Sequence, residues 1–148
     1  MDNDHLKIDI LSKNFLEKNI DHFISIANDI PKENWNLINY CYELPGKWEN
    51  SICISEIGTN NLLGFIIVST QGNKLHIHKF AVHPKFRSLG LGKKLLLHLE
   101  QLAKSSIVIQ ALSLYVDPLN IKAHIFYEQN GFKYISNDDD MFYFEKKL

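Results

Sequence analysis

The sequence predicts one α/β domain over residues 1–148, with a mixed sheet of roughly six or seven strands flanked by about four helices. First, a length of 148 residues suits one domain that buries its core without a disulfide or metal. Second, segments with strand-like alternation are followed by segments with helical spacing. Third, a strand, an amphipathic helix and a second buried strand follow one another mid-chain, and this βαβ order predicts a parallel pair.

The individual elements follow from local patterns and turn residues. β-branched and aromatic residues, or alternating apolar residues, predict strands over residues 6–11, 51–57, 62–70, 74–82, 107–116, 132–136 and 141–146. Apolar residues at helical spacing predict helices over 16–27, 31–42, 91–102 and 120–129. Pro31 suits the first turn of the second helix, where its missing N–H is not needed. The acidic run 137–140 predicts a solvated hairpin turn.

Composition limits the classes of partner. Sixteen Lys plus Arg against seventeen Asp plus Glu give a net charge of −1, which argues against a nucleic-acid-binding surface. Cys41 and Cys53 are too few for a disulfide framework and lack metal-type spacing. The polar start shows no export signal, and the longest apolar stretch, 62–68, is too short to span a membrane. We therefore expect a cytoplasmic protein with no nucleic-acid and no membrane partner.

A glycine-containing turn joins the strand at 74–82 to the helix at 91–102. Helix starts present unpaired N–H groups and a positive dipole, and Gly90 and Gly92 let an anion approach the backbone closely. Arg87, Lys93 and Lys94 add positive charge, so the turn suits a pyrophosphate. A Walker A loop would need Gly at 87 and Ser or Thr at 94, and a dinucleotide fingerprint would need Gly or Ala at 95. Neither pattern fits.

The sequence resembles the GNAT superfamily of acyl-CoA-dependent N-acyltransferases. The resemblance rests on Arg87-x-x-Gly90-x-Gly92, the preceding run at 80–84, and the later motifs Val116-x-x-x-Asn120-x-x-Ala123 and Phe126-Tyr127-Glu128-x-x-Gly131-Phe132. It implies acetyl-CoA as cosubstrate, no metal, and two central parallel strands that splay apart. By resemblance the pyrophosphate would be held by Arg87, Ser88, Leu89, Gly90, Leu91, Gly92 and Lys93, and the pantetheine arm by Phe80, Ala81, Val82 and Asn120. Asn120 also suits a helix N-cap.

His76 and His78 are the candidate bases. They lie two apart on a predicted strand, so their side chains are expected on one face. A substrate ammonium with a pKa of about 10 must lose a proton before it attacks, and a histidine with a pKa near ~6.5 can accept it. Two unused strand histidines, or a zinc pair lacking an evident third ligand, are the alternatives. The stretch 76–82 is similar to that of arylalkylamine N-acetyltransferases, which supports a base at His76 or His78.

Tyr127 is the candidate acid. A phenol with a pKa of about 10 can protonate a departing thiolate, and the resemblance assigns that role to the tyrosine of this motif. Aromatic packing is the alternative interpretation.

Together these inferences predict transfer of an acetyl group from acetyl-CoA to a small-molecule primary amine by direct attack in a ternary complex. A non-catalytic acyl-CoA sensor, and an enzyme acting on a protein N-terminus or aminoacyl-tRNA, are the alternatives. Residues 1–60 are expected to shape the acceptor pocket but do not identify the amine. The sequence leaves a homodimer open.

Overall fold

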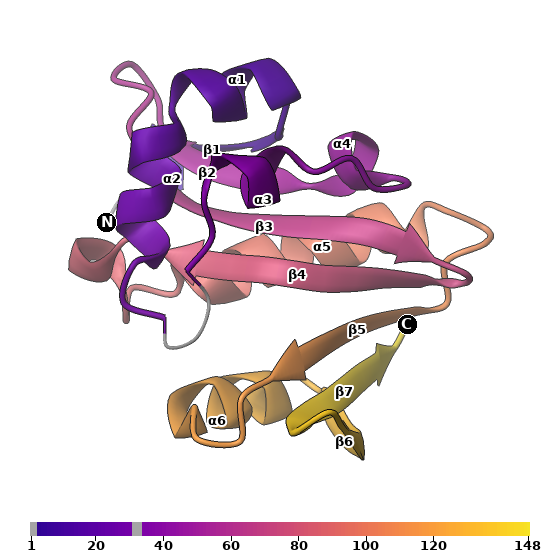
Figure 1. The fold of residues 1–148 in the computed structure, drawn as a ribbon. Coiled ribbons are helices and arrows are strands. Elements are labelled where there is room, and N and C mark those ends of the chain that lie inside the picture. Colours follow the sequence, from indigo (N-terminus) through magenta and orange to yellow (C-terminus); the bar gives the residue numbers. More distant parts are fainter. Residues whose placement is uncertain (1–2, 31–33) are drawn as a thin grey trace.

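A seven-stranded sheet forms the centre of the computed structural model, which describes residues 3–30 and 34–148 (Figure 1). The strand order is β1-β2-β3-β4-β5-β7-β6, and only β4 and β5 are parallel. The strands are β1 (Leu6–Ile10), β2 (Ile52–Glu56), β3 (Leu62–Gln71), β4 (Lys74–Val82), β5 (Ala111–Val116), β6 (Lys133–Asp138) and β7 (Met141–Lys147). The predicted mixed sheet and its parallel pair are confirmed.

Six α-helices lie within the described residues, more than the roughly four that the sequence predicted. They are α1 (Lys13–Lys18), α2 (Ile20–Ala27), α3 (Leu37–Cys41), α4 (Lys47–Asn50), α5 (Leu91–Lys104) and α6 (Ile121–Gln129). Two short 3₁₀ turns, Asn3–His5 and Pro84–Phe86, complete the structure.

Side-chain bonds to the backbone explain two differences from the predicted helices. Asn19 ends α1, because its Nδ2 donates to the carbonyl oxygen of Phe15 at 2.8 Å, so the predicted helix 16–27 divides there. Asn36 and Asn39 form a reciprocal capping box that starts α3 late, at Leu37. The expected helix start at Pro31 lies outside the described residues. The four-residue α4 was not predicted.

Two boundaries near the C-terminus test the sequence patterns. β5 starts at Ala111 rather than at 107, and Ile107 is 99% exposed, so the apolar run there does not belong to the sheet. Asp139 and Asp140 both have positive φ angles between β6 and β7. Such angles suit a two-residue hairpin turn, which confirms the turn predicted at 137–140.

Helices cover the two faces of the sheet with separate apolar cores. α1 to α4 lie on one side, over β1 to β4, and α5 and α6 lie on the other (Figure 1). Leu95 and Leu99 of α5 pack with Ile66 of β3, whereas Phe23 of α2 packs with Phe65 of β3. Alternate residues of β3 therefore serve opposite cores, as the two-residue period requires.

β4 and β5 separate part of the way along their length. Their pairing runs from Lys74 with Ala111 to Ile77 with Leu114 and then stops, and the two strands diverge toward α6 (Figure 1). Next to this point β4 carries a bulge: Ile77 pairs with Val68 and Lys79 with Ile67, so His78 is the extra residue. The bulge and the separation together place His78 where the sheet opens.

Candidate active site

A cleft of about 470 Å³ occupies the space between the diverging strands. Residues of β4, β5 and α6 form its walls, together with the segment that follows α2 and the glycine turn. The lining includes eight predicted site residues: His78, Phe80, Ala81, Val82, Arg87, Gly92, Asn120 and Tyr127. Residues far apart in sequence are thus brought to one site.

The end of β4 presents backbone groups to this cleft. The N–H of His83 donates to the carbonyl oxygen of Leu63 on β3 at 2.7 Å. Because backbone groups alternate in direction along a strand, those of Phe80 and Val82 point away from β3, toward the gap. β5 no longer pairs with this part of β4, so the backbone of Phe80 and the N–H of Val82 can bond an extended ligand, while the carbonyl oxygen of Val82 accepts from Arg87.

The glycine turn leads into the start of α5. Gly90 is the N-cap of α5 with φ of 81°, and no side chain caps the helix. The N–H groups in the first turn of a helix have no acceptor within the helix. Those of Leu91, Gly92 and Lys93 therefore point out of the N-terminal end of α5, where a ligand could accept from them. A Cβ at Gly92 would lie 3.5 Å from the ring of Phe126, so glycine here leaves room at the cleft wall. This geometry fits an anionic group such as a pyrophosphate.

The predicted turn residues do not all line one cavity. Arg87 and Gly92 line the cleft, whereas Gly90 and Lys93 border a second groove on the other side of α5, together with Lys94. Ser88 and Leu89 are exposed, and Leu91 is buried in the core beneath the turn. Leu91 can therefore contribute its backbone but not its side chain.

The side chain of Arg87 is already engaged by protein groups. Its guanidinium bonds both carboxylate oxygens of Asp29, at 2.6 and 2.9 Å, and its Nε donates to the carbonyl oxygen of Val82 at 2.9 Å. The hydrogen bonds from Arg87 lower the pKa of Asp29. Arg87 thus links the end of β4 to the segment after α2.

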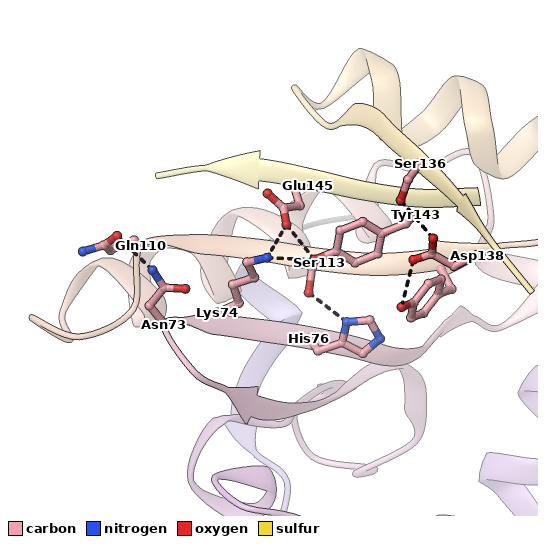
Figure 2. A network of polar contacts seen from close by, with 10 residues as sticks. Asn73, Lys74, His76, Gln110, Ser113, Ser136, Asp138, Tyr143 and Glu145 are labelled. Atoms are coloured by element: carbon pink, nitrogen blue, oxygen red, sulfur yellow. Dashed lines mark hydrogen bonds and ion pairs between the residues drawn. The ribbon is translucent and has the colours of Figure 1, made fainter. Parts of the chain in front are cut away.

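The two histidines differ in position. His78 lines the cleft, and its Nε2 is 2.7 Å from Oγ of Ser69 on β3. His76 is only 4% exposed, and its Nδ1 is 2.8 Å from Oγ of Ser113 on β5 (Figure 2). Their ring centroids are 4.8 Å apart. Within the described part of the chain, His78 lines the cleft and His76 does not.

Burial keeps both imidazoles neutral. Desolvation, with smaller repulsion from His78 and Lys74, lowers the pKa of His76 to about 4. Desolvation also lowers the pKa of His78, and the nearby positive charge of Lys47 adds to that effect. Lys47 is itself buried, and its Nζ donates to the carbonyl oxygens of Tyr40 and Tyr42.

Tyr127 lies on α6 at the opposite wall. Its ring packs against those of Phe80, Phe126 and Phe132, at centroid distances of 6.3, 5.4 and 5.4 Å. Asn120 accepts from the N–H of Ala123 at 3.3 Å and so caps α6 while lining the cleft. The predicted N-cap is confirmed.

Sequence patterns missed several residues of the site. Asp29, Tyr115 and Lys122 line the cleft, and Ser69 bonds the ring of His78; outside the cleft, Ser113 bonds the ring of His76. None belongs to a motif with chemical meaning, and only the strand register brings the serines to the histidines. Cys53 is buried, with its pKa raised to about 11 by desolvation, and neither described cysteine lines the cleft.

Two further findings concern other ligands and membranes. Within residues 3–30 and 34–148, no three His, Cys, Asp or Glu side chains are grouped to hold a metal ion. In the same part of the chain, no helix has the length and apolar character needed to cross a bilayer.

The splayed parallel strands and the glycine turn form a cleft that fits an extended, anionic ligand, and both His78 and Tyr127 line it. Residues 20–132 match the model of the acetyltransferase (GNAT) family, and the chain therefore belongs to that family. This confirms the resemblance seen in the sequence.

Individual relatives agree with the family assignment. A spermidine N(1)-acetyltransferase from Thermoplasma acidophilum is 33% identical over 88 residues, which cover 60% of this chain. The match spans about half of that relative, 54% of its length. The PaiA N-acetyltransferase of the same organism, solved with coenzyme A, superposes with a TM-score of 0.77 at 24% identity and covers 97% of this chain and 99% of its own. Ard1 from Thermoplasma volcanium has a TM-score of 0.81 at 22% identity, covering 97% and 98% of the two chains.

Proposed function

We propose that this protein transfers the acetyl group of acetyl-CoA to a primary amine of a small molecule, by direct attack in a ternary complex. One observation carries the proposal: a single cleft contains His78 on β4 and Tyr127 on α6, at the gap where β4 and β5 separate. A base and an acid at one opening are what amine acylation by a thioester requires.

The cosubstrate would extend from the glycine turn into the cleft. Backbone N–H groups of residues 87–93 would hold the pyrophosphate, since the first turn of α5 has no side-chain cap. The backbone of Phe80 and the N–H of Val82, which face the gap left by β5, would bond the pantetheine arm, with Asn120 across the gap. Because Arg87 is paired with Asp29, its expected contribution is through its backbone rather than its charge.

The reaction follows from these positions. His78 takes a proton from the acceptor ammonium, and the freed nitrogen lone pair attacks the thioester carbonyl carbon. Backbone N–H groups at the end of β4 stabilise the negative oxygen of the tetrahedral intermediate. The carbon–sulfur bond then breaks, and Tyr127 donates its proton to the leaving thiolate.

His78 rather than His76 is the proposed base. His78 lines the cleft, whereas His76 is buried behind it and bonded to Ser113. The lowered pKa of His78 keeps its imidazole neutral, and thus able to accept a proton, across neutral pH.

A cationic amine is the proposed acceptor class. The Thermoplasma acidophilum relative is a spermidine acetyltransferase. In this chain Tyr115, which lines the cleft, donates through its hydroxyl to Asp138 at 3.4 Å, so the acidic β6–β7 hairpin lies beside the cleft. Carboxylates beside the cleft would favour an acceptor with more than one ammonium group.

A panel of acceptors tests the proposal. The protein would be incubated with acetyl-CoA and with diamines, polyamines, amino sugars or short peptides, while release of the CoA thiol is followed. We expect release with the diamines and polyamines. Acetyl-CoA binding without thiol release for every amine would instead indicate a non-catalytic acyl-CoA sensor.

A further inference from the structure

Ser69 forms a buried contact with the proposed base. Its Oγ lies 2.7 Å from Nε2 of His78, and the serine is 2% exposed. At a buried position of low dielectric a hydrogen bond is stronger than in water, so the contact restrains the orientation of the ring.

This contact lies beside the β4 bulge. Across the β3–β4 ladder Ser69 pairs with His76, not with His78. His78 lies two residues beyond His76, at the bulge, and its ring reaches the serine diagonally across the ladder. The position opposite Ser69 is occupied by His76, which turns instead to Ser113 on β5 (Figure 2).

The bond to Ser69 determines which ring nitrogen of His78 can act. With Nε2 bonded to the serine, Nδ1 is the remaining nitrogen that can accept a proton from an acceptor. For Nδ1 to carry the lone pair, the hydrogen of the neutral ring must be on Nε2 and be donated to Oγ of Ser69. Once Nδ1 is protonated, the same bond becomes charge-assisted and stabilises the imidazolium.

We propose that Ser69 is a positioning residue for the transfer reaction: it holds the hydrogen of neutral His78 on Nε2 and thereby leaves Nδ1 as the proton acceptor in the cleft. This inference rests on the proposed function, in which His78 is the base. Ser69 does not line the cleft within the described residues, so it acts through His78 rather than on the substrate.

The chain supplies a matched control. Ser113 is also a buried strand serine whose Oγ bonds a histidine ring nitrogen, at 2.8 Å, but its partner is His76. Ser69→Ala and Ser113→Ala remove the same chemical group from equally buried positions on β3 and β5, the two strands that flank β4. A general loss of packing would affect both variants, whereas the proposed role affects only Ser69→Ala.

The test combines ring-nitrogen NMR with turnover. Long-range proton–nitrogen spectra at neutral pH, with the His78 signals identified by their loss in His78→Gln, should show a single wild-type tautomer with its hydrogen on Nε2. In Ser69→Ala the two nitrogen shifts should move toward each other, which indicates mixed tautomers, and kcat should fall about tenfold to a hundredfold. Ser113→Ala should keep both the His78 spectrum and kcat.

Different results would contradict different statements. A wild-type ring with its hydrogen on Nδ1, or an unchanged spectrum in Ser69→Ala, would overturn the role of Ser69. Wild-type kcat in Ser69→Ala would overturn it as well, provided that His78→Gln is inactive. Wild-type kcat in His78→Gln would instead contradict the proposed function, because the base would then lie elsewhere.

Discussion

Asp29 holds the guanidinium of Arg87 with two hydrogen bonds, 2.6 Å to Nη1 and 2.9 Å to Nη2. Arg87 precedes the glycine turn, and Asp29 follows α2, so the pair joins two walls of the cleft. Both side chains are more than one third exposed, which limits what the pair adds to stability. Its main effect is to neutralise a positive charge beside the expected pyrophosphate site.

Asp29→Asn should therefore strengthen the binding of acetyl-CoA. The substitution removes a negative charge from the cleft wall and leaves Arg87 unneutralised near an anionic ligand. At low salt we expect the Kd to decrease about two- to threefold by isothermal titration calorimetry. Asp21→Asn, an exposed change in the first turn of α2, is the control and should leave the Kd unchanged. Weaker binding in Asp29→Asn would show that the pair is needed to shape the cleft.

Gly90→Ala should weaken the binding of acetyl-CoA at least about tenfold. Gly90 has φ of 81°, and an added Cβ would project where the turn is expected to meet a phosphate. Gly72→Ala, in the β3–β4 turn with φ of 61°, introduces the same backbone strain away from the cleft. Equal Kd values for the two variants would contradict the assignment of the glycine turn as the pyrophosphate site.

Tyr127→Phe should lower kcat about a hundredfold without changing the KM for acetyl-CoA. The ring contacts with Phe80, Phe126 and Phe132 are retained, so the fold should be unaffected. The control is Tyr115→Phe, which removes a hydroxyl from another tyrosine of the same cleft. A wild-type kcat in Tyr127→Phe would show that Tyr127 is not the acid and serves only in aromatic packing.

His76 should make the stability of the fold depend on pH. An unfolded histidine binds a proton near pH ~6.5, whereas buried His76 does so near pH 4, so the unfolded state binds more protons between these values. Stability should be full above about pH 6.5 and fall by about 3 kcal/mol as the pH decreases to 4. Urea unfolding across this range should show a smaller decrease for His76→Gln, which cannot titrate. An equal decrease would show that other groups are responsible.

Much of this architecture follows from local patterns. The three meander strands, α5, the glycine turn and the N-cap of α6 were predicted close to where they occur, because each depends on neighbouring residues. Four predicted site residues of β4 (His78, Phe80, Ala81 and Val82) and Tyr127 of α6 line one cleft, whereas His76 of β4 does not.

The remaining features depend on contacts between distant segments. The bulge at His78 requires the register of β3 against β4, and the pairing of Arg87 with Asp29 spans 58 positions. The division at Asn19 depends on one side-chain bond that competes with helical spacing. Without the register, His76 and His78 were equivalent in the sequence, and only the fold separates the cleft histidine from the buried one.

The central claim is acetyl transfer to an amine by the base and acid of this cleft. Its most direct test measures CoA thiol release and N-acetylated amine together, by thiol assay and mass spectrometry, for wild type and His78→Gln. We predict one acetylated amine for each thiol released by the wild type, and a rate at least about a hundredfold lower for His78→Gln. Equal rates for the two proteins, or thiol release without acetylated amine, would contradict it.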